Sequence, residues 1–278
     1  MSERVKIILD KNADILRLPA IALRGLVVFP GNIIHFEVGR KKSIAAIEWA
    51  MSNNNAVFLT AQQDMDVEDP GFKDLYAYGV VAEVKQVLRV SDELVKVLVE
   101  GKYRAKLLTL DSSGRFLLAS TKAAALRGTK SVDSARVEAL VRSVKEAFEE
   151  YLSLNPRLSK DVVYTIITNE DAALLCDYIP ANLLLKYTDK QALLNEGTVS
   201  GRLEKLLEIL RRETKILHIE KDIQSKVNEQ MDKNQRDYYL REQMRAISNE
   251  LDDFDDTREE AEEYKAKIEK TKLPEEAR

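Results

Sequence analysis

The sequence predicts an α+β protein that has a strand-rich first part, a helical second part and one very long helix. Up to about residue 124, short apolar runs alternate with turn residues, a pattern typical of strands. After about Thr129 the apolar residues recur at helical spacing. Between Gly201 and Pro274 the chain has neither glycine nor proline, and strong helix formers dominate. We therefore expect four parts: 1–124 β-rich, 125–200 helical, 201–252 the long helix, and 253–278 the start of a helical linker.

The β-rich part is expected to form a small closed or nearly closed antiparallel barrel. Several short strands at this spacing, with one helix early among them, are typical of such barrels. The apolar period changes from that of a strand to that of a helix over Lys41–Ser52, and the acidic stretch Gln62–Asp74 is expected to be a long loop. The expected strands lie within Leu18–Val28, Ile33–Val38, Ala56–Ala61, Gly79–Val90, Leu94–Glu100, Tyr103–Leu110 and Phe116–Leu126.

The helical part contains two capping-box patterns, each of which predicts the start of a helix. Thr168 with Asp171 opens a helix that Pro180 is expected to stop, because proline lacks the backbone N–H of a helix interior. Thr188 with Gln191 opens a second, short helix. The expected helices are Val132–Leu154, Ser159–Ile167, one that ends at Ile179, one that ends before Gly197, and the long helix, which starts near Thr198 to Arg202.

The long helix is expected to present a surface to a partner or to connect parts of a larger protein. Fifty residues at about 1.5 Å per residue give a helix of roughly 75 Å, longer than a compact domain is wide. Apolar residues recur near its end at steps of four and three, the spacing of a coiled-coil seam. The run Asp252–Asp256 is expected to be a solvated loop, and Thr257 with Glu260 is expected to cap a last helix. The chain stops within charged helical sequence, so we expect it to be a fragment of a longer protein.

Composition narrows the function classes. The 278 residues carry a formal net charge of −4, which argues against nucleic-acid binding, because nucleic-acid binders usually carry a basic surplus. The single cysteine, Cys176, excludes an intramolecular disulfide and is expected to be a buried structural thiol. The N-terminus lacks the apolar core of a signal peptide, and no apolar stretch approaches the roughly 20 residues that span a bilayer. We expect a soluble cytoplasmic protein with no membrane partner.

Three separated stretches closely resemble the N-terminal region of the Lon proteases, which are ATP-dependent AAA+ serine proteases. They are Leu23–Gly31 with Val38–Ile47, Val95–Leu107 and Gln235–Ile247, and they occur in the order of the family. The resemblance implies that the barrel is similar to the PUA fold and is followed by a helical bundle. It also implies substrate recognition and oligomer assembly in a protease that degrades misfolded and regulatory proteins. The implied partners are unfolded or damaged proteins and, in a full-length protein, the other subunits of a hexamer.

The residues themselves predict no catalytic, cofactor or metal site in this fragment. Neither Gly39–Ser43 nor Gly101–Tyr103 has the glycine and Lys-Ser/Thr spacing of a phosphate-binding loop. His35 and His218 lie far apart, and neither has a further ligand at metal-binding spacing. By the resemblance, ATP and magnesium belong to an ATPase module outside this chain, and the Ser–Lys dyad belongs to a protease segment that the chain does not contain.

Candidate binding residues are apolar side chains that an exposed hydrophobic segment of a substrate could reach. We expect Phe29→Ser and Phe72→Ser to weaken substrate capture without loss of cooperative folding. The assembly candidates could equally pack within the same chain, and an RNA-binding PUA-like module or a coiled-coil scaffold without a protease partner remain alternatives. The substrate-binding candidates are Val28, Phe29, Pro30, Ile33, Ile34, Met65, Phe72, Leu75, Tyr76 and Tyr78, and the assembly candidates are Tyr238, Tyr239, Leu240, Met244 and Ile247.

Overall fold

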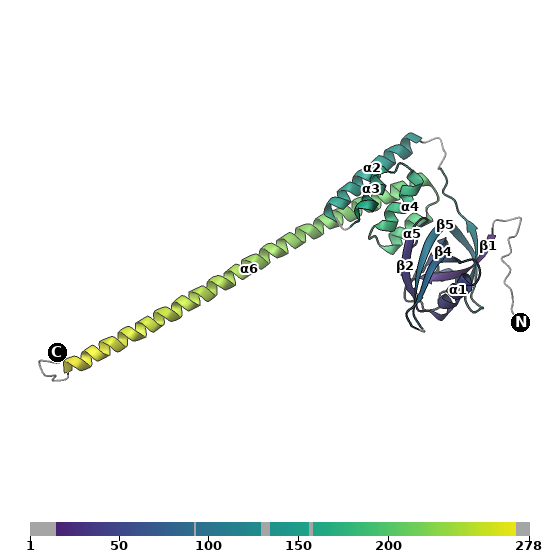
Figure 1. Ribbon diagram of the computed structural model, residues 1–278. Helices are drawn as coiled ribbons and strands as arrows, with labels where there is room; N and C mark the ends of the chain where they lie inside the picture. The colour runs from purple at the N-terminus through teal and green to yellow at the C-terminus, as the bar shows by residue number, and fades with distance from the viewer. Residues whose placement is uncertain (1–14, 92, 129–133, 156–157, 271–278) are drawn as a thin grey trace. The chain divides into compact units, whose positions relative to one another are not determined.

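The computed structural model describes the backbone of residues 15–91, 93–128, 134–155 and 158–270. The chain divides into two compact units, Met1–Leu217 and His218–Arg278. The first unit holds a β-barrel and a helical subdomain (Figure 1). Among the described residues, no helix combines the length and apolar character that a membrane crossing requires.

Six strands form the barrel, in the order β2-β5-β4-β3-β1-β6, and an additional pairing of β5 with β6 closes it. This arrangement confirms the predicted α+β class and barrel. Leu94–Glu100 and Tyr103–Leu110 were expected as two strands but form one, because β4 pairs with both segments, from Val95 to Lys106, and a bulge absorbs the irregularity between them. The strands are β1 Ile15–Leu23, β2 Ile33–Val38, β3 Ala56–Ala61, β4 Tyr78–Arg89, β5 Val95–Asp111 and β6 Leu117–Ala123, with the 3-10 turn η1 at Phe72–Asp74.

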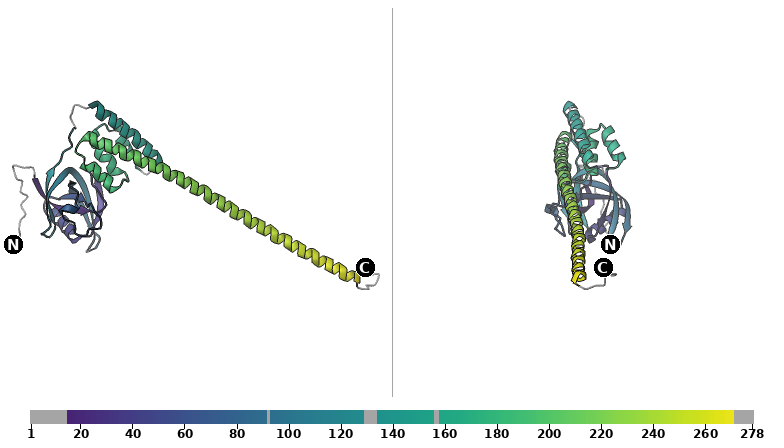
Figure 2. Two further views of the ribbon diagram at one scale, coloured as in Figure 1. Left: turned by 180° about the vertical axis from the view of Figure 1, so that it is seen from behind. Right: turned by 90° about the vertical axis from the view of Figure 1, so that its left-hand side faces the viewer.

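One pair of strands departs from the antiparallel expectation. β1 and β3 run parallel, with Ala20 opposite Phe58. The chain between them passes through β2 and helix α1 (Lys41–Met51), and parallel neighbours need a long crossover of this kind. Helix α1 covers one end of the barrel, as Figures 1 and 2 show.

The wall of the barrel between β5 and β1 is built in two pieces. β4 pairs with one edge of β5 from Val95 to Lys106, and β2 and β6 share the other edge, β2 along Val95–Glu100 and β6 along Ala105–Asp111. β6 pairs with both β5 and β1 and completes the ring. β2 pairs with β5 alone, so no strand ladder joins it to β1. Strand hydrogen bonds therefore close the barrel where β6 joins β5 to β1, and they leave a gap between β2 and β1.

The helical subdomain follows the predicted order, with two corrections in its first half. Asp171 itself caps α4, since its carboxylate accepts hydrogen bonds from the N–H groups of Ala173 and Leu174. Thr168 ends α3 instead. Pro180 does not stop α4 but lies buried in its last turns, where only one intrahelical bond is lost. The helices are α2 Ser134–Leu154, α3 Lys160–Thr168, α4 Ala172–Asn182, α5 Tyr187–Asn195 and α6 Val199–Lys270.

Two further expectations about helix ends are wrong. Helix α5 begins at Tyr187 with Lys186 at its N-cap, so Thr188 lies inside the helix and no side chain caps it. Gln191 instead donates hydrogen bonds to the Tyr78 carbonyl and to Asn195. The backbone of α6 continues through 252–256, expected as a loop, and past Thr257, expected as a new start. Neither glycine nor proline interrupts this stretch, so a local capping pattern does not end the helix.

Polar contacts join the barrel to the helical subdomain. Arg104 of β5 donates to the Asn195 carbonyl at 2.8 Å and lies 4.1 Å above the Tyr78 ring. Gln191 of α5 donates to the Tyr78 carbonyl at 2.8 Å. Within the helices, the fully buried Arg202 forms an ion pair with Asp177. The barrel, which ends near residue 124, and the helical subdomain that follows it therefore belong to one compact unit.

Candidate interaction surface

The structure divides the predicted substrate-binding residues into three groups. Val28, Phe29 and Leu75 are buried in the hydrophobic core. No partner can reach them from outside, and we expect Phe29→Ser to destabilise the fold, contrary to the sequence-based expectation. Ile33, Met65 and Phe72 are exposed. The half-buried candidates are Pro30, Ile34, Tyr76 and Tyr78.

The outer face of strands β2, β5 and β4 carries a hollow of about 380 Å³, which is lined by apolar Leu88, Val97 and Leu98 and by polar His35, Gln86 and Lys96. His35, Leu98 and Gln86 lie opposite one another on the three strands and line it. Leu88, 58% exposed, adds a large apolar side chain to the same hollow, and Ile33, 61% exposed, lies two residues before His35 on the same face of β2. The alternation of a strand puts the valines of β5 into the core and leaves this face outside.

Two smaller hollows lie beside Ile33 and on the helical subdomain. One, of about 220 Å³, is lined by Pro30 and Ile33 from the barrel and by Tyr178, Ala181 and Asn182 from α4. The other, of about 240 Å³, shares Asn182 and includes Leu184, which is 76% exposed. We call these three hollows the apolar track; its residues include Leu88, Leu98, His35, Ile33, Pro30, Tyr178, Ala181, Asn182, Leu158 and Leu184.

The exposed aliphatic side chains of the track suit contact with an apolar polypeptide. Exposed apolar side chains that follow one another over a surface mark interaction sites. Among the described residues, no group of three or more His, Cys, Asp or Glu side chains could hold a metal ion. Burial raises the pKa of the Cys176 thiol to about 12, and its Sγ faces the Val199 carbonyl at 3.8 Å, so this thiol is not an activated nucleophile.

Sequence reasoning found Ile33 and Pro30 but missed the rest of the track. Leu98 could have been found by following the strand alternation, because it lies between the buried Val97 and Val99. Leu88 could not, because alternation from the buried Val84 would place it in the core, and the irregularity between Val84 and Gln86 turns it outward. Leu184 gives no such signal, because it lies between α4 and α5, where helical periodicity has ended.

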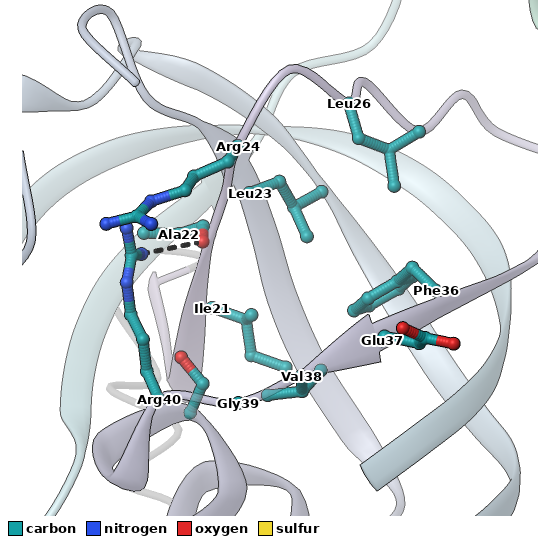
Figure 3. Close-up of a pocket in the computed structure, with 11 residues that line it drawn as sticks. Ile21, Ala22, Leu23, Arg24, Leu26, Phe36, Glu37, Val38, Gly39 and Arg40 are labelled. Atoms are coloured by element: carbon teal, nitrogen blue, oxygen red, sulfur yellow. Dashed lines mark hydrogen bonds between the residues drawn. The ribbon is translucent and has the colours of Figure 1, made fainter. Parts of the chain in front are cut away.

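A separate cavity of about 340 Å³ lies where the barrel wall is open, between the end of β1 and β2 (Figure 3). Figure 3 shows the guanidinium groups of Arg24 and Arg40 next to one another, on the side of β1 to which Ala22 points. Arg24 and Arg40 belong to the first of the stretches that carry the family resemblance, although the sequence does not show that they meet. The apolar lining residues are Ile21, Leu23, Leu26, Phe36 and Val38.

In the second unit, the predicted assembly residues are exposed on helix α6. Met244 is 72% exposed, and the other four, Tyr238, Tyr239, Leu240 and Ile247, are exposed as well. Leu240, Met244 and Ile247 follow at steps of four and three, so they share one face of the helix. Among the described residues of this unit, no side chain is buried.

Known proteins resemble the chain in sequence and in fold. The sequence profile of the ATP-dependent protease La (LON) substrate-binding domain matches residues 17–212. Lon protease of Escherichia coli (strain K12) is 39% identical over 268 residues, which cover 96% of this chain and 34% of that protein. Lon protease of Heliobacterium modesticaldum is 39% identical over 276 residues, which cover 99% of this chain and 33% of that protein. The chain thus spans about a third of the length of these relatives.

A solved structure agrees in fold. The N-terminal domain of Mycobacterium avium complex Lon protease superposes with a TM-score of 0.57 at 20% sequence identity, covering 70% of this chain and 98% of that domain. The shared part is thus nearly the whole of that domain. The superposition shows a shared fold, and the profile match over residues 17–212 shows that the chain belongs to the Lon substrate-binding domain family.

Proposed function

We propose that this chain is the substrate-recognition and assembly region of an ATP-dependent Lon-like protease that acts in the cytoplasm. The apolar track carries the proposal, because solvent-accessible apolar groups on a folded surface are what an exposed hydrophobic segment can bind. A misfolded client exposes such segments and a folded protein hides them. The track would thus select damaged or unfolded proteins for an ATPase and protease that lie outside this chain, where ATP and magnesium would bind.

Substitution within the track should weaken capture of an unfolded client. We expect Ile33→Ser and Leu184→Ser each to raise the Kd for a reduced and alkylated model protein about tenfold, since burying one large aliphatic side chain contributes about 1.5–3 kcal/mol. Both side chains are exposed, so the melting temperature should change little. Fluorescence anisotropy with the labelled client, together with a thermal melt of each variant, measures both quantities.

Met51→Ser is the matched control, because Met51 is 45% exposed at the end of α1 and does not line the track. It should bind the client like the wild type. Phe72→Ser tests the exposed candidate of the 62–75 loop separately. Equal client affinity in the wild type, Ile33→Ser and Leu184→Ser would rule out the track as the capture surface.

Assembly through α6 is the second part of the proposal. Leu240, Met244 and Ile247 would form the seam between helices of different subunits. We expect the wild-type chain to show a molecular mass in light scattering that rises with protein concentration, and we expect Leu240→Ser/Met244→Ser to shift that rise to at least tenfold higher concentration. Met231→Ser, an exposed methionine outside this seam, should not. A wild-type chain that stays monomeric at every concentration would assign assembly to other parts of the protease.

A further inference from the structure

β2 is the one strand of the described barrel that pairs on a single side. The other five strands each have at least two neighbours, whereas β2 pairs with β5 only, over Ile33–Val38. An edge of this kind presents unpaired main-chain N–H and C=O groups, which can accept a further strand. Proteins often block such edges with lysine or proline, and β2 contains neither.

The hydrogen-bond pattern shows which main-chain groups of β2 face β5. The Gly101 N–H of β5 donates to the Asn32 carbonyl at 2.9 Å, directly before β2 begins. The other side of β5 has the opposite phase, because the Val90 N–H, directly after β4, donates to the Leu94 carbonyl at 3.0 Å. Opposite residues in an antiparallel pair exchange hydrogen bonds at every second position. Every second residue of the chain from Asn32 through β2 therefore bonds to β5.

The main-chain groups of the residues between these positions point to the open side of β2. These residues are Ile33, His35 and Glu37. Among the described residues, no side chain and no segment outside the sheet forms a hydrogen bond with their main chain. Across the gap, the last carbonyls of β1 are already occupied: Arg40 donates to that of Ala22 at 3.2 Å, and the Gln62 N–H donates to that of Leu23 at 2.9 Å. The unpaired groups thus lie on the β2 side of the gap.

Open space borders β2 at both of its ends. The hollow of about 220 Å³ includes Ile33 at the start of the strand, and the cavity of about 340 Å³ includes Phe36 and Val38 at its end. Between them, His35 lines the hollow on the outer face. Figure 3 shows that Val38 lies close to Ile21 of β1 and that Phe36 lies farther from β1. The gap beside β2 therefore widens away from the point where the two strands meet.

We propose that the open edge of β2 binds an extended segment of a client polypeptide as an additional β-strand. The main chain of the segment would pair with Ile33, His35 and Glu37, and one apolar side chain would enter the cavity against Leu26 and Phe36. This inference rests on the proposed function and deepens it, because the backbone of the client is then recognised as well as its apolar side chains. A folded protein has its own main-chain groups paired and cannot offer them.

A single unfolded segment fits this edge better than a second copy of the barrel does. The edge faces a gap in the wall of one barrel, and β1 lies on the far side of that gap. A free segment is one strand wide, about 4.8 Å, whereas the β2 edge of a second copy would bring its own barrel with it. In strand addition, main-chain hydrogen bonds give affinity and pockets for alternate side chains give specificity.

The test uses the 278-residue chain and a short fluorescein-labelled peptide with a central leucine among valine and threonine residues. A series of the same peptide carries one N-methyl group at each successive position, which removes one main-chain donor and keeps every side chain. We expect the Kd to rise about tenfold at every second position and to change less than about twofold at the positions between, because a strand directs its N–H groups alternately to its two sides. Fluorescence anisotropy measures each Kd. A rise at all positions alike, or at none, overturns the inference.

His35→Pro tests the same contact from the side of the protein. Proline lacks the N–H that His35 directs to the open side, and edge strands tolerate proline at such a position, so the melting temperature should change little. We expect His35→Pro to weaken peptide binding about tenfold. His35→Ala is the matched control, because it keeps the N–H, and it should bind like the wild type. Equal binding by His35→Pro and the wild type contradicts the inference. If His35→Pro does not fold, the N-methyl series on the wild type decides alone.

Light scattering on the same proteins detects pairing between copies. Self-association that His35→Pro abolishes, together with an N-methyl series without alternation, would assign the edge to a second copy and overturn the inference.

The reduced and alkylated client separates this inference from the proposed function. If the wild type captures that client but the N-methyl series shows no alternation, the inference fails alone. If the wild type captures neither the client nor the peptide, the proposed function fails.

Discussion

Gly101→Ala should lower the free energy of unfolding by about 3 kcal/mol, the largest loss we expect from adding a single methyl group. A Cβ at Gly101 would lie 2.2 Å from the Phe29 carbonyl oxygen and 3.2 Å from a methyl group of Val80. The backbone cannot move away easily, because Gly101 exchanges hydrogen bonds of 2.8 and 2.9 Å with Gly31 and Asn32. Overpacking against fixed backbone forces the core around the buried Phe29 to shift.

Gly114→Ala is the matched control in the same barrel. A Cβ at Gly114 would meet nothing closer than the Phe116 carbonyl at 3.7 Å, an ordinary contact. Urea titration followed by circular dichroism should place Gly114→Ala within about 0.5 kcal/mol of the wild type. Similar midpoints for Gly101→Ala and Gly114→Ala would show that the loop of Phe29 can move away from β5.

Arg202→Met should cost about 3–5 kcal/mol at neutral pH, because it leaves the largely buried carboxylate of Asp177 without its partner. The substitution also removes donors to two carbonyls, that of Glu196 at 3.0 Å and that of Leu194 at 3.3 Å. Urea titration at pH 7 measures the loss. Arg136→Met, in an exposed pair with Glu204 at 2.6 Å, should cost less than about 1 kcal/mol.

The pH dependence of Arg202→Met follows from the burial of Asp177. Burial raises the pKa of this carboxyl group above its usual value, and Arg202 opposes that rise. Without Arg202 the folded-state pKa should rise further above the unfolded value, so the folded state takes up the proton more readily. The stability deficit of the variant should therefore shrink as the pH falls from 7 to 5. A deficit that grows over this interval would mean that Asp177 is not the source of the loss.

Sequence reasoning reached the fold because periodicity and helix breakers are local signals. The period change at Lys41–Ser52 predicted α1, and the missing glycines and prolines predicted a long α6. The errors occurred where tertiary contacts decide. Pro180 stays inside α4 because it is buried, and Gln191 bonds to the barrel instead of capping α5.

The candidate site was predicted less well than the fold. A run such as Val27–Phe29 is equally apolar whether it faces solvent or core, and only the packed structure shows that it is buried. Ile33 was found because it lies in the same apolar stretch, whereas Leu184 lies in a connection without periodicity. Arg24 and Arg40 are brought together by the meeting of β1 with the end of β2, which no local pattern encodes.

The position of β2 gives the barrel an unequal tolerance to damage. β5, β4, β3, β1 and β6 form a circle of paired neighbours that is complete without β2. Loss of any one of these five strands would convert the closed barrel into an open sheet with two unpaired strand edges. Loss of β2 would leave the closed set of strand pairings complete. Natural variation and engineered insertions should therefore be absorbed at β2 more readily than at any other strand.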